Sequence, residues 1–435
     1  MKKIVFFYLF HLTTLYTFAQ SFNYYENIYL KDYNYKLSIH ENYYNYPQTV
    51  KIENTTNSLL DPIINLNSTE TLKLSFDILA DEYSPFAYTF IHCNANWEYS
   101  DLNQLEYLEG FSENFIENYN YSFNTLTNYI HYEFIFPNET VKFKKSGNYI
   151  VLVYDVEKNI PVITKRFLVH ENIVNIEMDV KPAILPQNRE TKQQIKLIIS
   201  DYRSLNINDP AREIIINIQK NDNWNNLLKN IMPSFISDTK IEYDNPALMT
   251  FNGGDEFRDF DIKSLRYFGK NINSIETRYI QGSKIHLVDL YKDLILKYED
   301  YKFKYDLNGK FTTSISEMKN KDLEADYSLV KFRLKTDKLI KKDIYIYGEL
   351  TNWDTIPLAK MNFDLKHNEY YGYLFLKQGY YNYKYVTNQN NIVSSIENNF
   401  KETRNQYSAY VYVRILGSSY DRLVGIAKNN SNSLN

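Results

Sequence analysis

Apolar and polar residues alternate along short runs of this chain, and the spacing of nearly every run is that of a half-buried strand. In the first part of the chain such runs lie at 71–76, 88–91, 132–136, 149–154 and 165–169. Clusters of Asn, Pro, Gly and Asp separate them, and period-two alternation bounded by such residues is typical of strands with one face toward a core. The pattern therefore predicts a strand in each run.

Similar runs continue through the rest of the chain. A second set begins at 174–180 and includes 194–199 and 213–218, and a third set extends from 329 to 415. No amphipathic helical pattern separates these strands, as it would in a parallel sheet, so antiparallel pairing is expected. We predict an all-β protein of tandem immunoglobulin-like, antiparallel β-sandwich domains.

The chain begins with the features of a secretory signal peptide. Two lysines after Met1 precede an apolar run at 4–12, and the small residue Ala19 lies just before Gln20. This combination predicts cleavage after Ala19 and export of the remainder. A lipid anchor would need a cysteine at the cleavage point, and the sole cysteine is Cys93. We therefore expect an exported protein without a lipid anchor.

Turn and linker signals suggest where the domains begin and end. The turn at 145–148 precedes the strand that closes a first domain, and the acidic stretch at 317–327 is typical of a linker. The predicted division is a signal peptide at 1–19, an N-terminal β-sandwich at 20–171, a middle β-rich domain at 172–320, a C-terminal sandwich at 321–425 and a polar tail at 426–435.

Composition excludes several classes of partner. The net charge is −4 with both signs interspersed, so the sequence shows no basic stripe for nucleic acid. After the first 20 residues no segment reaches the roughly 18 apolar residues of a membrane-spanning helix, and we expect no direct membrane insertion. With one cysteine, no intramolecular disulfide can form, so the stability must come from the sheets and their cores.

A reactive or metal-binding centre is a first hypothesis for the segment YTFIHCNANW at 88–97. However, His92 and Cys93 are neighbours on a predicted strand, and neighbouring side chains point to opposite faces. They are therefore poorly placed to bind one ion. We expect His92 to be a hydrogen-bonded residue at the strand end and Cys93 to be a small buried apolar residue.

The acidic segment after the paired glycines at 253–254 is a second candidate. Asp255, Glu256, Asp259 and Asp261 could suggest a glycosidase acid pair or a calcium loop, but their spacing matches no known calcium loop. A charged loop held by flanking phenylalanines is the alternative that we favour. The sequence also lacks a nucleophile elbow, a P-loop and a His-Glu-x-x-His motif. We expect no catalytic residues, no metal site and no cofactor.

The last third of the chain resembles the early-set β-sandwich of glycogen-binding modules. The segments that carry this resemblance are YIYGELTNWD at 345–354 and EYYGYLFLKQGYYNYKY at 369–385. In those modules two tryptophans and a hairpin lysine bind sugar, and Trp353 and Lys384 match one tryptophan and the lysine. The segment 387–391 has no second tryptophan. The resemblance therefore implies an early-set-like fold and a packing role for Trp353, and it argues against glycan binding.

Motifs spread over most of the chain resemble the plug protein family of the type IX secretion system of Bacteroidota. They occur in family order between about residues 24 and 425, although the Tyr/Asn-rich segment at 24–46 matches loosely. The motifs are YTFIHCNANW at 88–97, EYLEGF at 106–111, YSFN at 121–124, KSGNY at 145–149, FNGGDEFR at 251–258, LKQGYYNY at 376–383 and YDRLVG at 420–425.

The resemblance implies a non-enzymatic, periplasmic protein associated with the outer-membrane translocon barrel. In the family such a plug closes the periplasmic opening of the barrel until cargo arrives. Predicted export, the absence of an anchor and the lack of an active-site motif agree with this role. Two alternatives remain open from the residues: a periplasmic or surface glycan-binding protein that uses Trp353 and Lys384, and a hydrolase that uses Asp259, Asp261 or His92.

Overall fold

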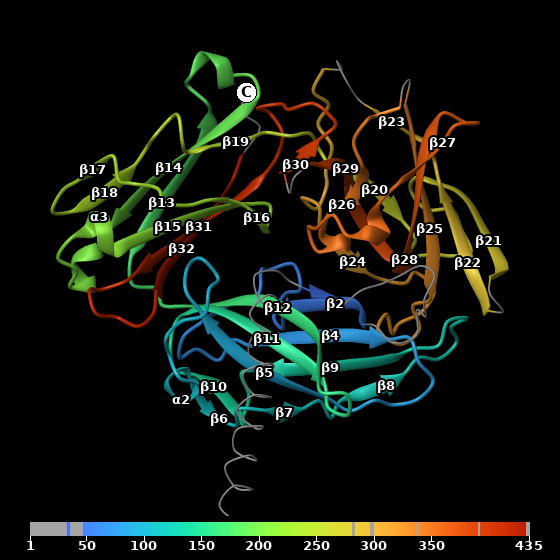
Figure 1. Ribbon diagram of the computed structural model, residues 1–435, viewed down its shortest axis with the longest axis horizontal. Coiled ribbons are helices and arrows are strands. Elements are labelled where there is room, and N and C mark those ends of the chain that lie inside the picture. Colours follow the sequence, from blue (N-terminus) through green and yellow to red (C-terminus); the bar gives the residue numbers. More distant parts are fainter. Residues whose placement is uncertain are drawn as a thin grey trace, which may run out of the picture.

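Three β-sandwiches make up the part of the chain that the structure describes (Figure 1). The computed structural model describes residues 33–34, 47–280, 283–295, 300–336, 339–389 and 392–431. Nearly all strand pairs in these residues are antiparallel, and the helices are single turns. The prediction of an all-β protein of antiparallel sandwiches is confirmed.

The N-terminal sandwich contains the blue and teal strands at the bottom of Figure 1. One sheet has the order β1-β12-β11-β5-β7, with β3 also paired to β12, and the facing sheet has the order β2-β4-β9-β8. The elements are β1 Tyr33–Asn34, β2 Pro47–Asn54, β3 Ile63–Asn65, β4 Leu72–Ile78, β5 Phe86–Cys93, α2 Gln104–Tyr107, β6 Leu108–Gly110, β7 Asn114–Phe115, β8 Tyr119–Tyr121, β9 Ile130–Phe136, β10 Val141–Phe143, β11 Gly147–Asp155 and β12 Ile160–His170.

Aromatic rings fill the core of the N-terminal sandwich. Phe90 lies with its ring centroid 4.9 Å from that of Phe136 and 5.7 Å from that of Phe167, so both sheets contribute rings to one cluster. Such tilted and edge-to-face pairs contribute stabilising free energy in addition to that gained by burying the apolar area of the rings. Every second residue of a strand faces the same side, so the alternation in the sequence places these rings on the face of each strand that lies toward the core.

A discontinuous sandwich follows, and it takes its strands from two distant parts of the chain. Its sheets have the orders β13-β14-β18-β17, with β19 paired to β14, and β16-β15-β31-β32. The elements are β13 Asn175–Pro182, η2 Pro186–Asn188, β14 Lys192–Ser200, η3 Tyr202–Leu205, α3 Pro210–Glu213, β15 Ile214–Lys220, β16 Asn223–Leu228, β17 Phe235–Ile236, β18 Lys240–Tyr243, β19 Thr250–Asn252, β31 Gln406–Val413 and β32 Arg422–Asn430.

The inserted sandwich lies between β19 and β31 in the sequence. One sheet has the order β20-β29-β24, with β26 and β30 also paired to β29, and the other has the order β21-β22-β25-β28-β27, with β23 paired to β25. The elements are β20 Arg258–Asp261, β21 Ile272–Ile280, β22 Ser283–Leu290, β23 Asp293–Leu294, β24 Phe311–Thr313, β25 Tyr327–Lys335, β26 Ile344–Tyr347, η4 Glu349–Thr351, η5 Pro357–Ala359, β27 Asn362–Asp364, β28 Glu369–Lys377, β29 Gly379–Gln389 and β30 Ile392–Ser395.

The sheets group the strands differently from the boundaries expected at 320/321 and 425/426. The red strands β31 and β32 lie among the green strands of the discontinuous sandwich in Figure 1, because β31 pairs with β15. The stretch at 317–327 connects β24 to β25 within the inserted sandwich and is not a linker between domains. Residues 426–430 continue β32 and are not a polar tail.

Two predicted segments fall largely outside the described residues. They are the signal peptide at 1–19 and the Tyr/Asn-rich segment at 24–46, of which only β1 is described. In the described part of the chain, no helix is long and apolar enough to cross a bilayer.

Apolar clusters join the N-terminal sandwich to both of its neighbours. Trp97 and Leu152 pack with Tyr412 of the discontinuous sandwich, and Leu79 and Tyr129 pack with Tyr327 of the inserted one. Large apolar contacts between domains restrict their relative motion. The three sandwiches therefore form one packed body.

Candidate functional site

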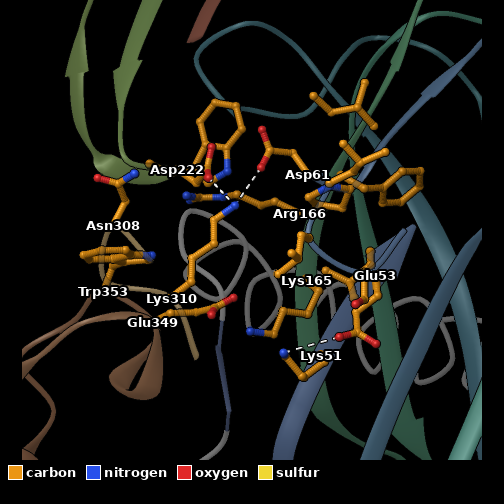
Figure 2. Close-up of a pocket in the computed structure, with 18 of the residues that line it drawn as sticks. Lys51, Glu53, Asp61, Lys165, Arg166, Asp222, Asn308, Lys310, Glu349 and Trp353 are labelled. Atoms are coloured by element: carbon orange, nitrogen blue, oxygen red, sulfur yellow. Dashed lines mark hydrogen bonds and ion pairs between the residues drawn. The ribbon is translucent and has the colours of Figure 1, made fainter. Parts of the chain in front are cut away.

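A cavity of about 330 Å³ lies where the three sandwiches meet (Figure 2). The N-terminal sandwich contributes Lys51 and Asp61, the discontinuous sandwich contributes Asp222, and the inserted sandwich contributes Lys310 and Trp353. Lys51 lies within strand β2, and the other four side chains come from loops and turns. The site therefore exists only when all three sandwiches are in place.

Lys310 joins all three sandwiches through one ammonium group. Its Nζ lies 2.9 Å from Oδ1 of Asp61 and 2.5 Å from Oδ2 of Asp222, as the dashed lines in Figure 2 show. Lys428 of β32 also pairs with Asp61. The side chain of Asp61 is 5% exposed and that of Asp222 is 17% exposed, so solvent screens these pairs weakly. Two carboxylates from different sandwiches thus share one cation.

The two carboxylates respond differently to this arrangement. Burial acts to raise the pKa of Asp61, but the ammonium groups of Lys310 and Lys428 outweigh it and hold that pKa well below its usual range. Burial, together with the nearby negative charge of Asp61, raises the pKa of Asp222 to about 6. Asp61 is therefore the stably ionised partner of the pair at neutral pH.

Further hydrogen bonds cross the same junction. Lys51 donates from Nζ to the Phe311 carbonyl at 2.9 Å, and Lys165 donates to Oδ1 of Asn352 at 2.6 Å. Asn225 of the discontinuous sandwich donates to the Trp353 carbonyl at 2.7 Å. The two lysine bonds connect the N-terminal and inserted sandwiches, and the Asn225 bond, which is exposed, connects the discontinuous and inserted ones.

A second buried polar cluster joins the N-terminal and inserted sandwiches. The carboxylate of Asp77, which is 1% exposed, accepts hydrogen bonds from His131 Nδ1 at 2.6 Å, from Lys377 Nζ at 2.6 Å and from the Tyr327 hydroxyl at 2.7 Å. Lys377 is 2% exposed, and Asp77 is the buried carboxylate that pairs with its ammonium group. We call Asp77, His131, Tyr327 and Lys377 the Asp77 cluster.

The Asp77 cluster predicts that stability depends on pH through His131. Burial acts to lower the pKa of His131, but the hydrogen bonds to Asp77 and Glu133 raise it from 6.5 to about 9. A histidine with a raised pKa in the folded state stabilises the fold fully below its unfolded pKa and loses that effect as the pH rises through the folded pKa. We expect the free energy of unfolding to fall by about 3 kcal/mol between about pH 6.5 and pH 9. Urea unfolding at several pH values checks this, and the same slope in His131→Gln would contradict it.

His92 and Cys93 take the structural roles expected for them. His92 is buried, donates from Nε2 to the Ser146 carbonyl at 3.1 Å and lies 2.9 Å from the Ser100 hydroxyl. Burial lowers its pKa to about 4, which favours the neutral ring. Cys93 packs with Leu152 in an apolar cluster on the other face of β5.

Cys93 is expected to be unreactive in the folded protein. Its side chain is fully buried, and burial raises the pKa of its thiol to about 12, whereas the reactive species is the thiolate. A disulfide reagent at about pH 8 should modify less than about a tenth of the protein in an hour and all of it in denaturant. Rapid modification of folded protein would contradict the burial.

The acidic segment after Gly254 is tied into the scaffold. Asp259 lies on strand β20, not in a loop as expected, and its fully buried carboxylate contacts Lys270 and Lys304 Nζ, both at 2.5 Å. Asp261 pairs with Lys263 at 3.0 Å. The flanking Phe257 and Phe260 are buried, as predicted. Among the described residues, no group of three His, Cys, Asp or Glu side chains is placed to hold a metal ion.

Glu256 and Asp255 also make scaffold contacts. Glu256 accepts a hydrogen bond from the Tyr301 hydroxyl at 2.6 Å, and burial raises its pKa to about 6. Asp255 accepts a hydrogen bond from the Glu256 amide at 2.8 Å. The side chains of this segment have separate partners and do not converge on a shared cleft.

Trp353 and Lys384, the two candidates for sugar binding, meet around one phenylalanine. Trp353 lies edge to face with Phe257, with 5.9 Å between ring centroids, and Lys384 Nζ lies 3.9 Å from the centre of the same ring. Trp353 also packs against Tyr347. The structure thus brings the two residues together, and Trp353 has the predicted packing role. Sugar binding by them stays the alternative hypothesis that the sequence left open.

Sequence reasoning did not find the buried ionic residues. Asp77 lies within the apolar strand at 72–78, and Lys377 is the last, buried residue of the strand at 369–377. A charge at such a position is a signal that a partner lies opposite. Asp61, Asp222 and Lys310 lie in or beside turns, where charged residues are ordinary. No local pattern connects these three residues.

The fold and the junction define a β-protein whose three sandwiches are held as one body. Residues 48–171 match the family model described as the type 9 secretion system plug protein 1st domain. The chain is also similar to a hypothetical protein from Parabacteroides merdae ATCC 43184, known from a crystal structure: the identity is 30%, the TM-score is 0.83, and the match covers 88% of this chain and 97% of the other. This chain belongs to the type 9 secretion system plug protein family.

Two further comparisons add nothing to this assignment. The C-terminal domain of the antigen I/II-family protein AspA from Streptococcus pyogenes aligns over 89% of this chain and 99% of its own, but at 8% identity and a TM-score of 0.19. A TM-score this low does not indicate a shared fold. No curated protein matches the chain.

Proposed function

We propose that this protein is a periplasmic plug that closes the periplasmic opening of the type IX outer-membrane translocon until cargo arrives, and that it acts without enzymatic turnover. The observation that carries the proposal is the match of residues 48–171 to the first domain of the plug family. Predicted export supports the periplasmic location. The partner is then the translocon barrel, and the contact is one between proteins.

The packing of the sandwiches supports a role that depends on shape. A stopper must keep its outline against a wide pore, and hinges between its parts would let it deform. The apolar clusters, the bridge through Lys310 and the Asp77 cluster connect every pair of sandwiches. Since interfaces of this kind resist relative domain motion, the protein can present one fixed face to the pore.

Co-purification tests the partner directly. The translocon barrel is isolated in mild detergent from cells with an affinity tag on the barrel, and this chain should be recovered with it. Cells that lack the chain should become permeable to large antibiotics that the outer membrane normally excludes. A barrel recovered repeatedly without this chain, and an unchanged permeability in its absence, would refute the proposal.

Photo-crosslinking identifies the face that meets the barrel. Each sandwich offers an exposed aromatic position: Phe115 at 66%, Phe235 at 52% and Tyr279 at 79% exposed. A photoreactive residue at each position serves as the matched control for the others. A plug that seats one face should crosslink strongly from one sandwich, whereas equal, weak crosslinking from all three would indicate nonspecific contact.

A further inference from the structure

A groove next to the junction cavity, with which it shares Arg166, Trp224 and Trp353, opens between the discontinuous and inserted sandwiches. Its volume is about 1370 Å³, larger than a typical site for a small ligand. The discontinuous sandwich contributes β16 with Trp224, the inserted sandwich contributes Trp353 and Lys384, and the N-terminal sandwich contributes Trp97 and Arg166. All three tryptophans of the chain therefore line one groove.

The groove is cationic in a chain whose net charge is −4. Among the described residues that line it, Asp354 is the single carboxylate, although Asp255, Glu256, Asp306 and Glu397 also act on the charge of Lys384. The cationic side chains that line it are Arg166, Lys192, Lys220, Lys229 and Lys384. A cleft of one sign concentrates ligands of the opposite sign, so the charge favours an anionic ligand.

Two of these lysines flank the same point of the groove. The Nζ atoms of Lys220 and Lys384 each lie 3.6 Å from the position that a Cβ on Gly254 would take. Lys220 donates to the carbonyls of Asn252 and Gly253 at 2.6 and 2.7 Å, and Lys384 donates to the carbonyl of Asp255. Among the described residues, neither ammonium group forms an ion pair.

The repulsion between these lysines would be relieved by a bound anion. Burial and the neighbouring charge of Lys384 hold the pKa of Lys220 well below its usual range, and burial also lowers the pKa of Lys384. An anion within hydrogen-bond reach of both would restore the charged forms. Carbonyl partners leave some of the three N–H donors of each ammonium group available for such a ligand.

The remaining lining residues suit sugar rings. Trp224 and Trp353 are partly exposed, and an aromatic ring presents an apolar face to the C–H face of a sugar. Eight asparagines line the groove, among them the exposed Asn226. An amide side chain both donates and accepts, which matches sugar hydroxyls that do the same. The cationic side chains would also bind an acidic peptide, but the many asparagine amides match the hydroxyl groups of a sugar better than the carboxylates of such a peptide.

Backbone strain marks the same residues. Trp97 and Trp353 have φ angles of 70° and 55°, and for bulky residues this left-handed conformation is an outlier. Such strain is retained where a structure fixes side chains for a purpose. Here it positions two of the three aromatic rings at the groove.

We propose that this groove binds an acidic oligosaccharide, with the carboxylate or phosphate of one sugar between Lys220 and Lys384 and neighbouring rings against Trp224 and Trp353. This inference does not rest on the plug role, since it concerns the purified protein alone. The segment 387–391 of the inserted sandwich has no second tryptophan. In the folded protein, Trp224 of the discontinuous sandwich lies along the groove that holds Trp353 and Lys384 and provides this second ring.

Tryptophan fluorescence and calorimetry at low salt test the proposal, because every tryptophan lines the groove. The probes are trigalacturonate as the carboxylate ligand, a mannose-6-phosphate oligosaccharide as the phosphate ligand, methyl-esterified trigalacturonate as the neutral control and a glutamate-rich peptide as the rival class. We expect a saturable fluorescence change with at least one acidic sugar and none with the ester. The sugar that binds more tightly identifies the acidic group.

Variants separate the groove from general charge. Lys384→Met should weaken binding about 10-fold or more, since a charge-assisted hydrogen bond is lost, and Lys384→Arg should restore part of the affinity. Lys229→Glu changes an exposed groove position and should also weaken binding without affecting the fold. Lys366→Met, at an exposed turn outside the groove, is the matched control and should bind like the wild type.

Three results would overturn the proposal. The first is the absence of a signal with both acidic sugars at millimolar concentration. The second is equal binding of the neutral ester. The third is a glutamate-rich peptide that binds more tightly than either sugar with the same dependence on Lys384, which would make the groove a peptide site.

Discussion

Replacing Asp77 with Asn is expected to lower the free energy of unfolding by about 4 kcal/mol. The amide preserves the shape of the side chain, but the charges of His131 and Lys377 lose their counterion in an almost fully buried place. Removing one partner of a buried ion pair leaves a desolvated charge, which costs several times more than breaking a surface pair. The midpoint of urea unfolding, followed by circular dichroism, measures the loss.

Two comparisons make the Asp77 prediction specific. Lys360→Met breaks the pair with Asp343, whose side chains are 45% and 53% exposed, and should cost less than about 1 kcal/mol. The double variant Asp77→Asn with Lys377→Met removes the orphaned ammonium group and should be more stable than the sum of the single changes implies. An Asp77→Asn protein that unfolds at the same urea concentration as Lys360→Met would contradict the role of the cluster.

Lys310→Met is expected to destabilise the protein by about 3 kcal/mol and to loosen the junction of the three sandwiches. Methionine retains the apolar stem, but Asp61 keeps only Lys428 and Asp222 is left beside another carboxylate. Hydrogen exchange should increase in β16 and η4, which border the junction, while the cores of the separate sandwiches stay protected. Unchanged exchange in both elements would show that the bridge is dispensable.

The pH dependence of Lys310→Met follows from Asp222. The pKa of this carboxyl in the folded protein is already raised to about 6, above 3.8 for the free group, and loss of the lysine raises it further. A carboxyl group whose pKa is higher in the folded than in the unfolded protein does not lower the stability while it is protonated in both states. It lowers the free energy of unfolding once the pH exceeds its pKa in the unfolded protein. The deficit of the variant should therefore be smaller at about pH 5 than at pH 8. The addition of Asp222→Asn should remove this difference.

The sequence was informative about strands and poor about their partners. Alternation correctly predicted β4, β5, β9, β11 and β12, because the two faces of each strand meet different environments. Which strands pair depends on contacts between residues far apart in the sequence, and local alternation does not indicate these contacts. For that reason the sequence could not show that β31 belongs beside β15 and not with the strands that precede it.

The candidate sites show the same limit. His92 and Cys93 could be assigned to the scaffold because they are adjacent on one strand, so their geometry was local. Asp61, Asp222 and Lys310 come from three sandwiches, and each is an unremarkable charged residue in its own surroundings. Only the packing of the sandwiches reveals that they share one buried point.

The insertion of one sandwich into another sets an order for folding. Strand β15 ends at Lys220, and its partner β31 begins only at Gln406, so the sheet stays incomplete until the residues of β31 are available to pair. Closing so long a loop carries an entropic cost before any contact repays it, which slows folding. Until then the apolar side of β15 stays uncovered, and the unfinished sheet is prone to aggregation during that interval. A C-terminal truncation before Gln406 should therefore yield an insoluble product, although the inserted sandwich itself would be intact.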